Sequence, residues 1–145
     1  MKGGNTVPEK DIGYLIKNIN DKLKVKADAD LKRHNITLSQ SRVFAFLNSK
    51  GGQATQKEIE IFLEVSHPTV VGIVSRMERN GYVISYIDEN DRRNKIVKLT
   101  KQAEALRMDM ERSMIANEQK ILTSFSNEDI KRLREMLLRI YKNLE

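Results

Sequence analysis

The sequence predicts a mainly α-helical protein with one small β-hairpin. In the first and the last third of the chain, apolar residues recur every three or four positions, which is the period of an amphipathic helix. The period changes to two in YVISYI (82–87) and KIVKLT (95–100), and the polar stretch DENDRRN (88–94) separates these two segments. Two short alternating segments around a polar turn are typical of a β-hairpin.

The composition is typical of a helical protein that works inside the cell. Hydrophobic residues make up 39% of the 145 residues and charged residues 32%, which suits a single domain over residues 1–145. The absence of cysteine excludes disulfides and thiolate zinc sites and fits a reducing compartment. No apolar run reaches membrane-spanning length and the N-terminus lacks a signal-peptide pattern, so we expect a cytoplasmic protein without a membrane partner.

The N-terminal third predicts a long helix over about 9–33 and a second helix after it. One apolar stripe runs along the first helix at steps of three and four: Ile12, Ile16, Ile19, Leu23 and Ala27. The stretch TLSQ (37–40) has the pattern of a capping box, in which the Thr37 hydroxyl accepts a hydrogen bond from the amide three residues on. The pair Gly51-Gly52 ends the second helix and starts a turn.

The next two helices are joined by a tight turn. The stretch TQKE repeats the capping pattern at Thr55, and only EVS (64–66) separates this helix from one that begins with SHPT. Ser66 is a suitable N-cap, and Pro68 lies in the first turn, where its missing N–H is not needed. Gly81 ends this helix in the position of a left-handed cap. The first helix of the pair has three apolar residues expected on its buried side: Ile59, Phe62 and Leu63.

Two further helices are predicted over about 101–125 and from Ser126 onwards. The second of them has apolar residues at alternating spacings of three and four: Ile130, Leu133, Leu137, Ile140 and Leu144. This spacing is the pattern by which one helix packs along another.

Three short helices, the last two joined by a tight turn, and a following hairpin describe a winged helix-turn-helix over about 37–100. In this fold the second helix of the pair lies in the major groove of DNA and presents small polar residues near its N-terminus. Ser66, His67 and Thr69 meet this requirement. No acidic residue occurs between Ser66 and Met77, so this part of the helix has no negative charge that would repel DNA phosphates.

The placement of charge, more than its total, favours a nucleic-acid partner. The formal net charge is +6, yet the segment 53–100 contains seven basic and seven acidic residues. Arg92 and Arg93 lie at the tip of the hairpin, which is narrow enough to enter a minor groove, where arginine is favoured. Asp91 can orient one of these arginines through a bidentate pair.

The predicted DNA contacts combine base edges and phosphates. Val71, on the helix that begins with SHPT, can make an apolar contact with a thymine methyl group, whereas the basic side chains around that helix can contact phosphates. The residues predicted to contact DNA are Lys57, Ser66, His67, Thr69, Val71, Arg76, Arg92, Arg93 and Lys95. Thr37 and Thr55 are predicted to cap helices near the DNA, and Asp91 is predicted to orient the wing.

Three stretches resemble the multiple-antibiotic-resistance regulator (MarR) family of transcription factors. The wing stretch DRRNKIVKLT matches the family's pattern of Asp-x-Arg followed by a strand that ends in Leu-Thr, here at Asp91, Arg93, Leu99 and Thr100. VSHPTVVGIVSRMERNGYV is similar to its recognition helix with the trailing glycine and strand, and TLSQSRV to the start of its second helix. The chain departs from the family's usual pattern at four positions: Val71, Ser85, Glu89 and Ala103.

The resemblance implies a homodimer in which the first helix and the last two helices, at about 9–33 and 101–145, interlock. Each winged helix-turn-helix would then bind half of a pseudo-palindromic operator. Family members are mostly repressors, often released by small aromatic acids or other amphipathic effectors. The residues expected at the dimer interface are Ile12, Ile16, Ile19, Leu133, Leu137, Ile140 and Leu144.

The expected function is therefore that of a sequence-specific, ligand-responsive DNA-binding regulator, most simply a repressor. The alternative is a winged-helix protein-interaction module without specific DNA binding, which the neutral middle segment and Ser85 permit. The sequence has no phosphate-binding glycine loop, nucleophile elbow or HExxH motif, so no enzyme is predicted. Two histidines far apart and no cysteine give no support for a metal or cofactor, and the effector site is not predicted.

Overall fold

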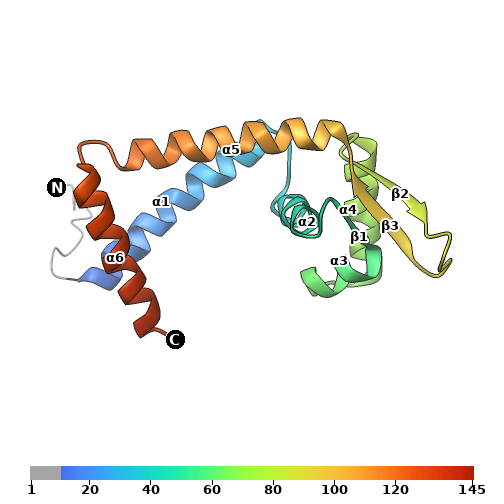
Figure 1. Cartoon of the computed structure of the whole chain (residues 1–145), viewed down its shortest axis with the longest axis horizontal. Helices are drawn as coiled ribbons and strands as arrows, with labels where there is room; N and C mark the ends of the chain where they lie inside the picture. The colour runs from blue at the N-terminus through green and yellow to red at the C-terminus, as the bar shows by residue number, and fades with distance from the viewer. Residues whose placement is uncertain (1–10) are drawn as a thin grey trace, which may run out of the picture. The chain divides into compact units, whose positions relative to one another are not determined.

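The computed structural model describes residues 11–145, which form six helices and one three-stranded sheet (Figure 1). The elements in chain order are α1 (Ile12–Arg33), α2 (Leu38–Ser49), β1 (Gln53–Thr55), α3 (Gln56–Leu63), α4 (His67–Arg79), β2 (Val83–Ile87), β3 (Lys95–Leu99), α5 (Lys101–Ile121) and α6 (Asn127–Asn143). The chain divides into two compact units, and the boundary lies within α5, between Arg107 and Met108. The predicted class, mainly α with a winged helix-turn-helix, is confirmed.

The predicted starts of α2, α3 and α6 are confirmed by their caps, whereas the predicted start of the first helix, at about residue 9, lies outside the described residues. At α2, α3 and α6 a hydroxyl accepts a hydrogen bond of 3.1 Å from the amide three residues on, and that residue's side chain accepts one from the cap's own amide. The capping pairs are Thr37 with Gln40, Thr55 with Glu58 and Ser126 with Asp129. These bonds satisfy amides that have no partner within the helix, and so each helix begins where the sequence pattern places it.

The sheet contains one strand that the sequence pattern does not predict. Its order is β1–β3–β2 with antiparallel neighbours, so β3 is the central strand. Strand β1, in the segment read from the sequence as a turn after Gly51-Gly52, places Ala54 opposite Val97, and both side chains are buried. A strand of three residues is too short to show a period of two, whereas the unpaired edge of β3 provides a partner for its backbone.

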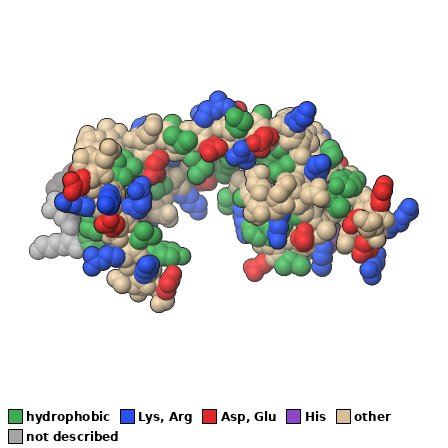
Figure 2. All heavy atoms as spheres, viewed as in Figure 1, with side chains coloured by type: hydrophobic (Ala, Val, Ile, Leu, Met, Phe, Trp, Pro, Cys, Tyr) green, Lys and Arg blue, Asp and Glu red, His purple; other side chains and the backbone are tan. Residues whose placement is uncertain are grey.

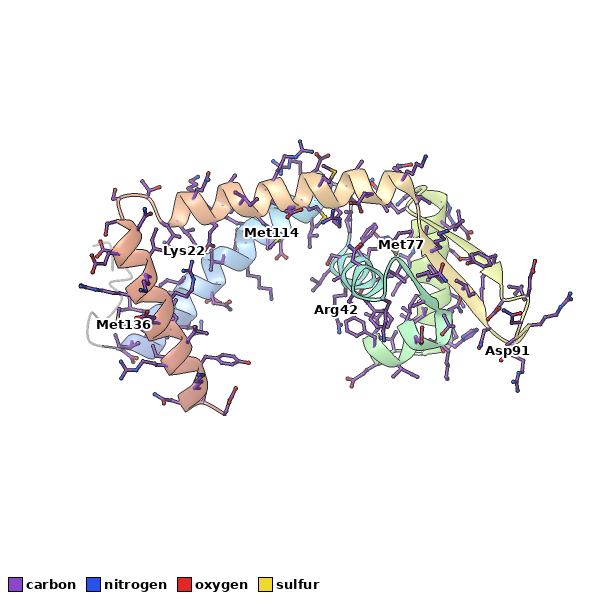
Figure 3. The ribbon with its side chains drawn as sticks, in the orientation of Figure 1. Lys22, Arg42, Met77, Asp91, Met114 and Met136 are labelled. Atoms are coloured by element: carbon purple, nitrogen blue, oxygen red, sulfur yellow. The ribbon has the colours of Figure 1, made fainter. Side chains whose placement is uncertain are left out.

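The core of the first unit lies between α2, α3, α4 and the sheet. Its fully buried side chains come from each of these elements: Val43, Leu47, Ile59, Val70, Val74, Met77, Val83 and Val97. Met77 points from α4 into this core (Figure 3). Close packing of these side chains fixes the position of α4 relative to the wing.

One predicted core residue of α3 is not buried. Phe62 is 42% exposed, because its ring stacks on Phe46 at the surface, with ring centroids 4.5 Å apart and planes 10° from parallel. The Arg42 guanidinium lies 5.6 Å from the centroid of the Phe62 ring on the same surface. The expectation that Phe62 faces the core is therefore wrong, while Ile59 and Leu63 are buried as predicted.

The end of α4 leads directly into the wing. Gly81 has φ +82°, and the amide of Tyr82 donates to the carbonyl of Met77 at 2.9 Å, which closes the helix in the predicted left-handed cap. The Thr100 hydroxyl donates to the carbonyl of Gly81 at 2.6 Å. This bond connects the end of the returning strand to the end of α4.

The remaining helices expose much of their apolar surface. No residue of Ile12–Arg33 or of Asn127–Asn143 is buried. Leu137 is 48% exposed and Leu144 82%, and Ile12, Ile16 and Ile19 are exposed as well. Helix α5 ends at Ile121, four residues before the predicted end. Between residues 11 and 145, no helix combines the length and the hydrophobicity that crossing a membrane requires.

Candidate nucleic-acid interface

The helix-turn-helix consists of α3, α4 and the three residues between them. Glu64, the first residue of this turn, adopts left-handed backbone angles with φ +55°, and its amide donates to the carbonyl of Ile61. The turn is tight because its third residue, Ser66, is already the N-cap of α4, which begins at His67. One side of α4 is buried in the core, and the opposite side, including Val71, is left for a partner.

The first turn of α4 contains the polar residues predicted to read DNA. The Ser66 hydroxyl accepts a hydrogen bond from the Thr69 amide at 3.4 Å and lies 2.8 Å from the Thr69 hydroxyl. Both side chains are exposed, so each keeps hydrogen-bonding capacity toward solvent. Pro68 lies in the first turn, where its missing N–H leaves no backbone donor without a partner.

His67 makes a contact that the sequence pattern does not predict. Its Nδ1 forms a short hydrogen bond with Oε1 of Glu60, on the preceding helix α3. The Glu60 side chain is only 9% exposed, whereas that of His67 is 68% exposed. Lys57 lies on the other side of the same carboxylate, with its Nζ 3.7 Å from Oε2. An acidic residue therefore lies beside the start of α4, although α4 itself contains no acid before Glu78.

The tip of the wing is organised by Asp91. Its Oδ1 accepts a hydrogen bond from Arg93 Nε at 3.1 Å, and its Oδ2 accepts one from Arg93 Nη2 at 3.3 Å. The Arg93 amide also donates to Oδ1, at 3.2 Å. The guanidinium first, and the backbone amide second, hold the pKa of Asp91 below the usual value of an aspartate. The predicted bidentate pair between Asp91 and a wing arginine is thus present.

The two wing arginines differ in their surroundings. Among the described residues, Arg92 has no hydrogen-bonding or ion-pair partner, and its side chain is exposed. Arg93 is held by Asp91 even though its side chain is 90% exposed. Figure 2 shows basic side chains projecting from the end of the wing with acidic side chains among them. One arginine is therefore positioned before any partner binds, and its neighbour is free to adapt.

A groove of about 420 Å³ lies between α3, α4 and the wing. Five of the residues predicted to contact DNA line it: Lys57, His67, Val71, Arg93 and Lys95. Three further lining residues were not predicted: Gln56, Glu60 and Asn94. The side-chain oxygen Oε1 of Gln56 is buried without a hydrogen-bond donor among the described residues. The side chains that line the groove therefore include three basic groups and one carboxylate, from Glu60.

The other predicted residues lie outside this groove. Arg76, one turn after Gly72, turns back along α4 and donates from Nε to the Gly72 carbonyl at 3.2 Å. Thr37 and Thr55 act as helix caps, as predicted. Ser85, on β2, donates its amide to Glu78 Oε1 at 3.0 Å. In the described part of the chain, no three His, Asp or Glu side chains cluster in a way that would hold a metal ion.

Two of the missed residues, Gln56 and Glu60, are buried through tertiary packing. Gln56 and Glu60 are polar residues on a short helix, where the sequence offers no reason to bury them. The one available signal is spacing, since Glu60 lies one helical turn after both Gln56 and Lys57 on α3. The side of α3 that contains Glu60 faces the start of α4, as the Glu60–His67 hydrogen bond shows.

The chain matches known regulators over its winged helix-turn-helix and beyond. The model of the MarR family matches residues 34–94. An uncharacterised HTH-type transcriptional regulator of Bacillus subtilis, YwoH, is 36% identical over 119 residues, which cover 80% of this chain and 85% of that protein. The homoprotocatechuate degradative operon repressor of Escherichia coli is 28% identical over 107 residues, 74% of this chain and 72% of the repressor.

Solved structures agree with these sequence relatives. MepR, a transcription regulator of the Staphylococcus aureus multidrug efflux pump MepA, superposes with a TM-score of 0.82 at 26% identity, over 93% of this chain and 99% of MepR. A complex of MepR with DNA gives a TM-score of 0.75 at 27% identity, over 92% and 99% of the two chains. Together with the predicted and observed wing, these similarities show that the chain belongs to the MarR family of transcriptional regulators.

Proposed function

We propose that this protein is a sequence-specific DNA-binding repressor that binds a pseudo-palindromic operator as a homodimer. The observation that carries the proposal is the groove between α3, α4 and the wing. Side chains from all three segments line it, and five of the nine residues predicted from the sequence to contact DNA are among them. The exposed polar start of α4 lies beside a groove that is also lined by Lys57, Arg93 and Lys95. Polar and basic side chains in this arrangement suit a partner that presents base edges and phosphates.

The nine predicted DNA contacts divide into two roles in this proposal. Ser66, His67, Thr69 and Val71 lie in the first turns of α4 and contact base edges in the major groove. The basic side chains contact phosphates or enter the adjacent minor groove: Lys57, Arg76, Arg92, Arg93 and Lys95. Asp91 holds Arg93 in position, so that less side-chain entropy is lost when DNA binds.

Dimerisation supplies the second half of the binding site. The exposed apolar residues of α1 and α6 support this part of the proposal, since exposed apolar surface of this extent is typical of a protein-protein interface. A dimer would place two copies of α4 about one helical turn of DNA apart, ~34 Å, on one face of the duplex. We expect this regulator to act in the cytoplasm, the compartment that the sequence favours.

We further infer regulation by a small aromatic or amphipathic effector that favours a dimer geometry with a different spacing of the two α4 helices. An effector can act in this way only to the extent that it binds the two geometries with different affinity. A saturating compound that leaves the DNA affinity unchanged is therefore not the effector. Binding, not catalysis, is the activity proposed.

The experiment that tests the proposal measures fluorescence anisotropy of labelled DNA with the purified protein, across a series of salt concentrations. DNA from upstream of the protein's own gene is compared with scrambled DNA, and random DNA is then enriched over several rounds of selection. The proposal predicts an enriched pseudo-palindrome, bound at least about a thousand times more tightly than scrambled DNA, with a steep salt dependence. Equal and weak binding to every sequence would instead favour the protein-interaction module.

A further inference from the structure

Glu60 lies beneath the first residue of the helix proposed to read DNA. Its carboxylate is 9% exposed and its Oε1 forms the short hydrogen bond with Nδ1 of His67. The imidazole is 68% exposed, so its other nitrogen, Nε2, is on the side of the ring that is open to a partner. Glu60 and His67 are seven residues apart in sequence and come from different helices.

This contact determines which nitrogen of a neutral His67 has the hydrogen. An ionised carboxylate only accepts hydrogen bonds, so the imidazole nitrogen that faces it must donate. Nδ1 is therefore protonated, and Nε2 of the neutral ring has a free lone pair and acts as an acceptor. A histidine without such a neighbour exchanges between its two tautomers and has no fixed preference for donors or acceptors.

The tautomer has a direct consequence for base recognition. In the major groove, cytosine N4 and adenine N6 are amino donors, whereas guanine presents the acceptors O6 and N7 and thymine the acceptor O4. An acceptor at Nε2 can accept a hydrogen bond from an amino group, whereas it is repelled by the lone pair of a base acceptor. The ring therefore distinguishes between base pairs by the position of their exocyclic amino groups.

We propose that Glu60 is a positioning residue that holds His67 as the Nδ1–H tautomer, and that His67 thereby selects a cytosine or adenine amino group at one operator position. This inference rests on the proposed function, because it assigns a specificity to one of its base contacts. Glu60 itself contacts no DNA. It acts only through the imidazole.

The surrounding charges are consistent with an ionised Glu60. Lys57 on α3 lies 3.7 Å from Oε2, and Arg93 and Lys95 of the wing line the same groove. The partial positive charge of the α4 N-terminus lies beside the carboxylate as well, since His67 is the first residue of that helix. The carboxylate is therefore surrounded by positive charge, and as an anion it accepts from Nδ1–H.

A first experiment reads the tautomer directly, without DNA. Two-bond ¹H–¹⁵N correlation spectra of the full chain with ¹⁵N-labelled histidine distinguish a protonated ring nitrogen from an unprotonated one, and they are recorded across a pH series from about 6 to 9. The expected result is a protonated Nδ1 and an unprotonated Nε2 in His67. The opposite tautomer, or an equal mixture of both, would overturn the proposal.

Variants on α3 provide the controls for this spectrum. Glu60→Ala removes the acceptor and is expected to produce a tautomer mixture at His67. Glu64→Gln removes one carboxylate from the end of the same helix, at an exposed position, and should leave the tautomer unchanged. A mixture in Glu64→Gln as well would mean that the net charge, and not the contact with Glu60, determines the tautomer.

A second experiment measures the specificity that follows from the tautomer. Operator variants with each of the four base pairs under His67 are compared by anisotropy for the wild type, His67→Ala, Glu60→Ala and the near-isosteric Glu60→Gln. The wild type should prefer an amino group at this position about fivefold, the effect of one hydrogen bond worth ~1 kcal/mol. His67→Ala and Glu60→Ala should each lose this preference, and the double variant should lose no more than either single one.

The two experiments separate this inference from the proposed function. Glu60→Gln keeps the volume of the side chain, but its amide can either accept from Nδ1–H or donate to an unprotonated Nδ1, so only part of the preference should remain. A merely structural role of Glu60 would leave the preference whole in this variant. A wild-type preference for guanine would overturn the inference, because it requires a donor at Nε2. If no sequence is bound specifically, the proposed function fails and the base selection with it, whereas the spectrum still decides the relation of Glu60 to His67.

Discussion

Arg93 and Asp91 form a bidentate pair at the tip of the wing, with one guanidinium nitrogen 3.1 Å from Oδ1 and another 3.3 Å from Oδ2. The two residues are separated by one residue in the sequence, and the Arg93 amide donates to the same carboxylate at 3.2 Å. The carboxylate therefore orders the backbone of the turn and the side chain that extends from it. Arg92, between them, has no such partner among the described residues.

The wing arginines are expected to bind phosphates or the minor groove at two points in each protomer. Replacing both Arg92 and Arg93 with Ala should weaken operator binding and reduce the slope of log K against log salt by about one unit for each phosphate that is no longer neutralised. Anisotropy across a salt series measures both quantities. Lys120→Ala, which removes a charge from the exposed end of α5, is the matched control and should leave the slope unchanged. An unaltered slope in the double variant would show that the wing arginines do not contact DNA phosphates.

The Asp91–Arg93 pair should be visible in the titration of the carboxyl group. The folded protein holds the pKa of Asp91 below its usual value, so the pair is intact above the usual range and is lost as the pH falls through the lowered pKa. Arg93→Ala should raise this pKa towards the ordinary value, because it removes the guanidinium hydrogen bonds. NMR titration of the Asp91 carboxyl carbon measures the change. Arg92→Ala is the control and should leave the pKa low, since Arg92 makes no bond to Asp91.

The same substitution at two glycines near α4 should have opposite effects on stability. Gly81 has φ +82°, and a Cβ added there would lie 2.6 Å from Oε1 of Gln102, so Gly81→Ala should lower the free energy of unfolding by roughly 1–2 kcal/mol. Gly72 is inside α4, where an added Cβ meets only the end of the Arg76 side chain at 3.4 Å. Gly72→Ala should therefore raise the free energy of unfolding by about 0.5–1 kcal/mol.

Chemical denaturation of both glycine variants measures these two changes. The Gly81 result tests the left-handed cap that leads into the wing, and the Gly72 result tests the helical backbone of α4. Destabilisation by both substitutions would show that α4 does not tolerate a methyl group on its open side.

The apolar seam of α6 is expected to hold two copies of the chain together. Leu137 is 48% exposed and lines an apolar groove with Tyr141 and Leu133, so a charge at this position would be placed in the dimer interface. Leu137→Asp should shift the protein from dimer to monomer in analytical ultracentrifugation and weaken operator binding. Ile61→Asp is the matched control, because Ile61 is 67% exposed on α3, which is not one of the predicted interface helices. A dimer that persists in Leu137→Asp would place the interface elsewhere.

The N-cap of α3 offers a test of the helix-turn-helix itself. Thr55→Ala removes the hydroxyl that accepts from the Glu58 amide and should lower the free energy of unfolding by ~1 kcal/mol. Thr55→Ser keeps this hydroxyl and should retain most of the stability. Chemical denaturation compares the two variants. A change in the denaturant midpoint reports a change in stability when the slope of the free energy of unfolding against denaturant stays the same. Equal losses in both would mean that the methyl group of Thr55, rather than the hydrogen bond, stabilises the helix start.

Local chemistry in the sequence determined where most elements begin and end. Capping pairs such as Thr37 with Gln40 need only a few neighbouring residues, and Gly81 is favoured wherever the backbone requires a positive φ. The Asp91–Arg93 pair belongs to the same class, because it closes within three residues of one turn. The alternating pattern of β2 and β3 was predictable for the same reason, since a period of two is visible over five residues.

Only the tertiary structure decided the features that depend on the distance between elements. Strand β1 exists because the central strand β3 offers a free edge to three residues that show no period of their own. Phe62 is at the surface because Phe46 from another helix lies in position to stack on it. Glu60 is buried against His67 because core packing sets the angle between α3 and α4, and a helix-helix angle is a property of the assembled core, which no short stretch of sequence encodes.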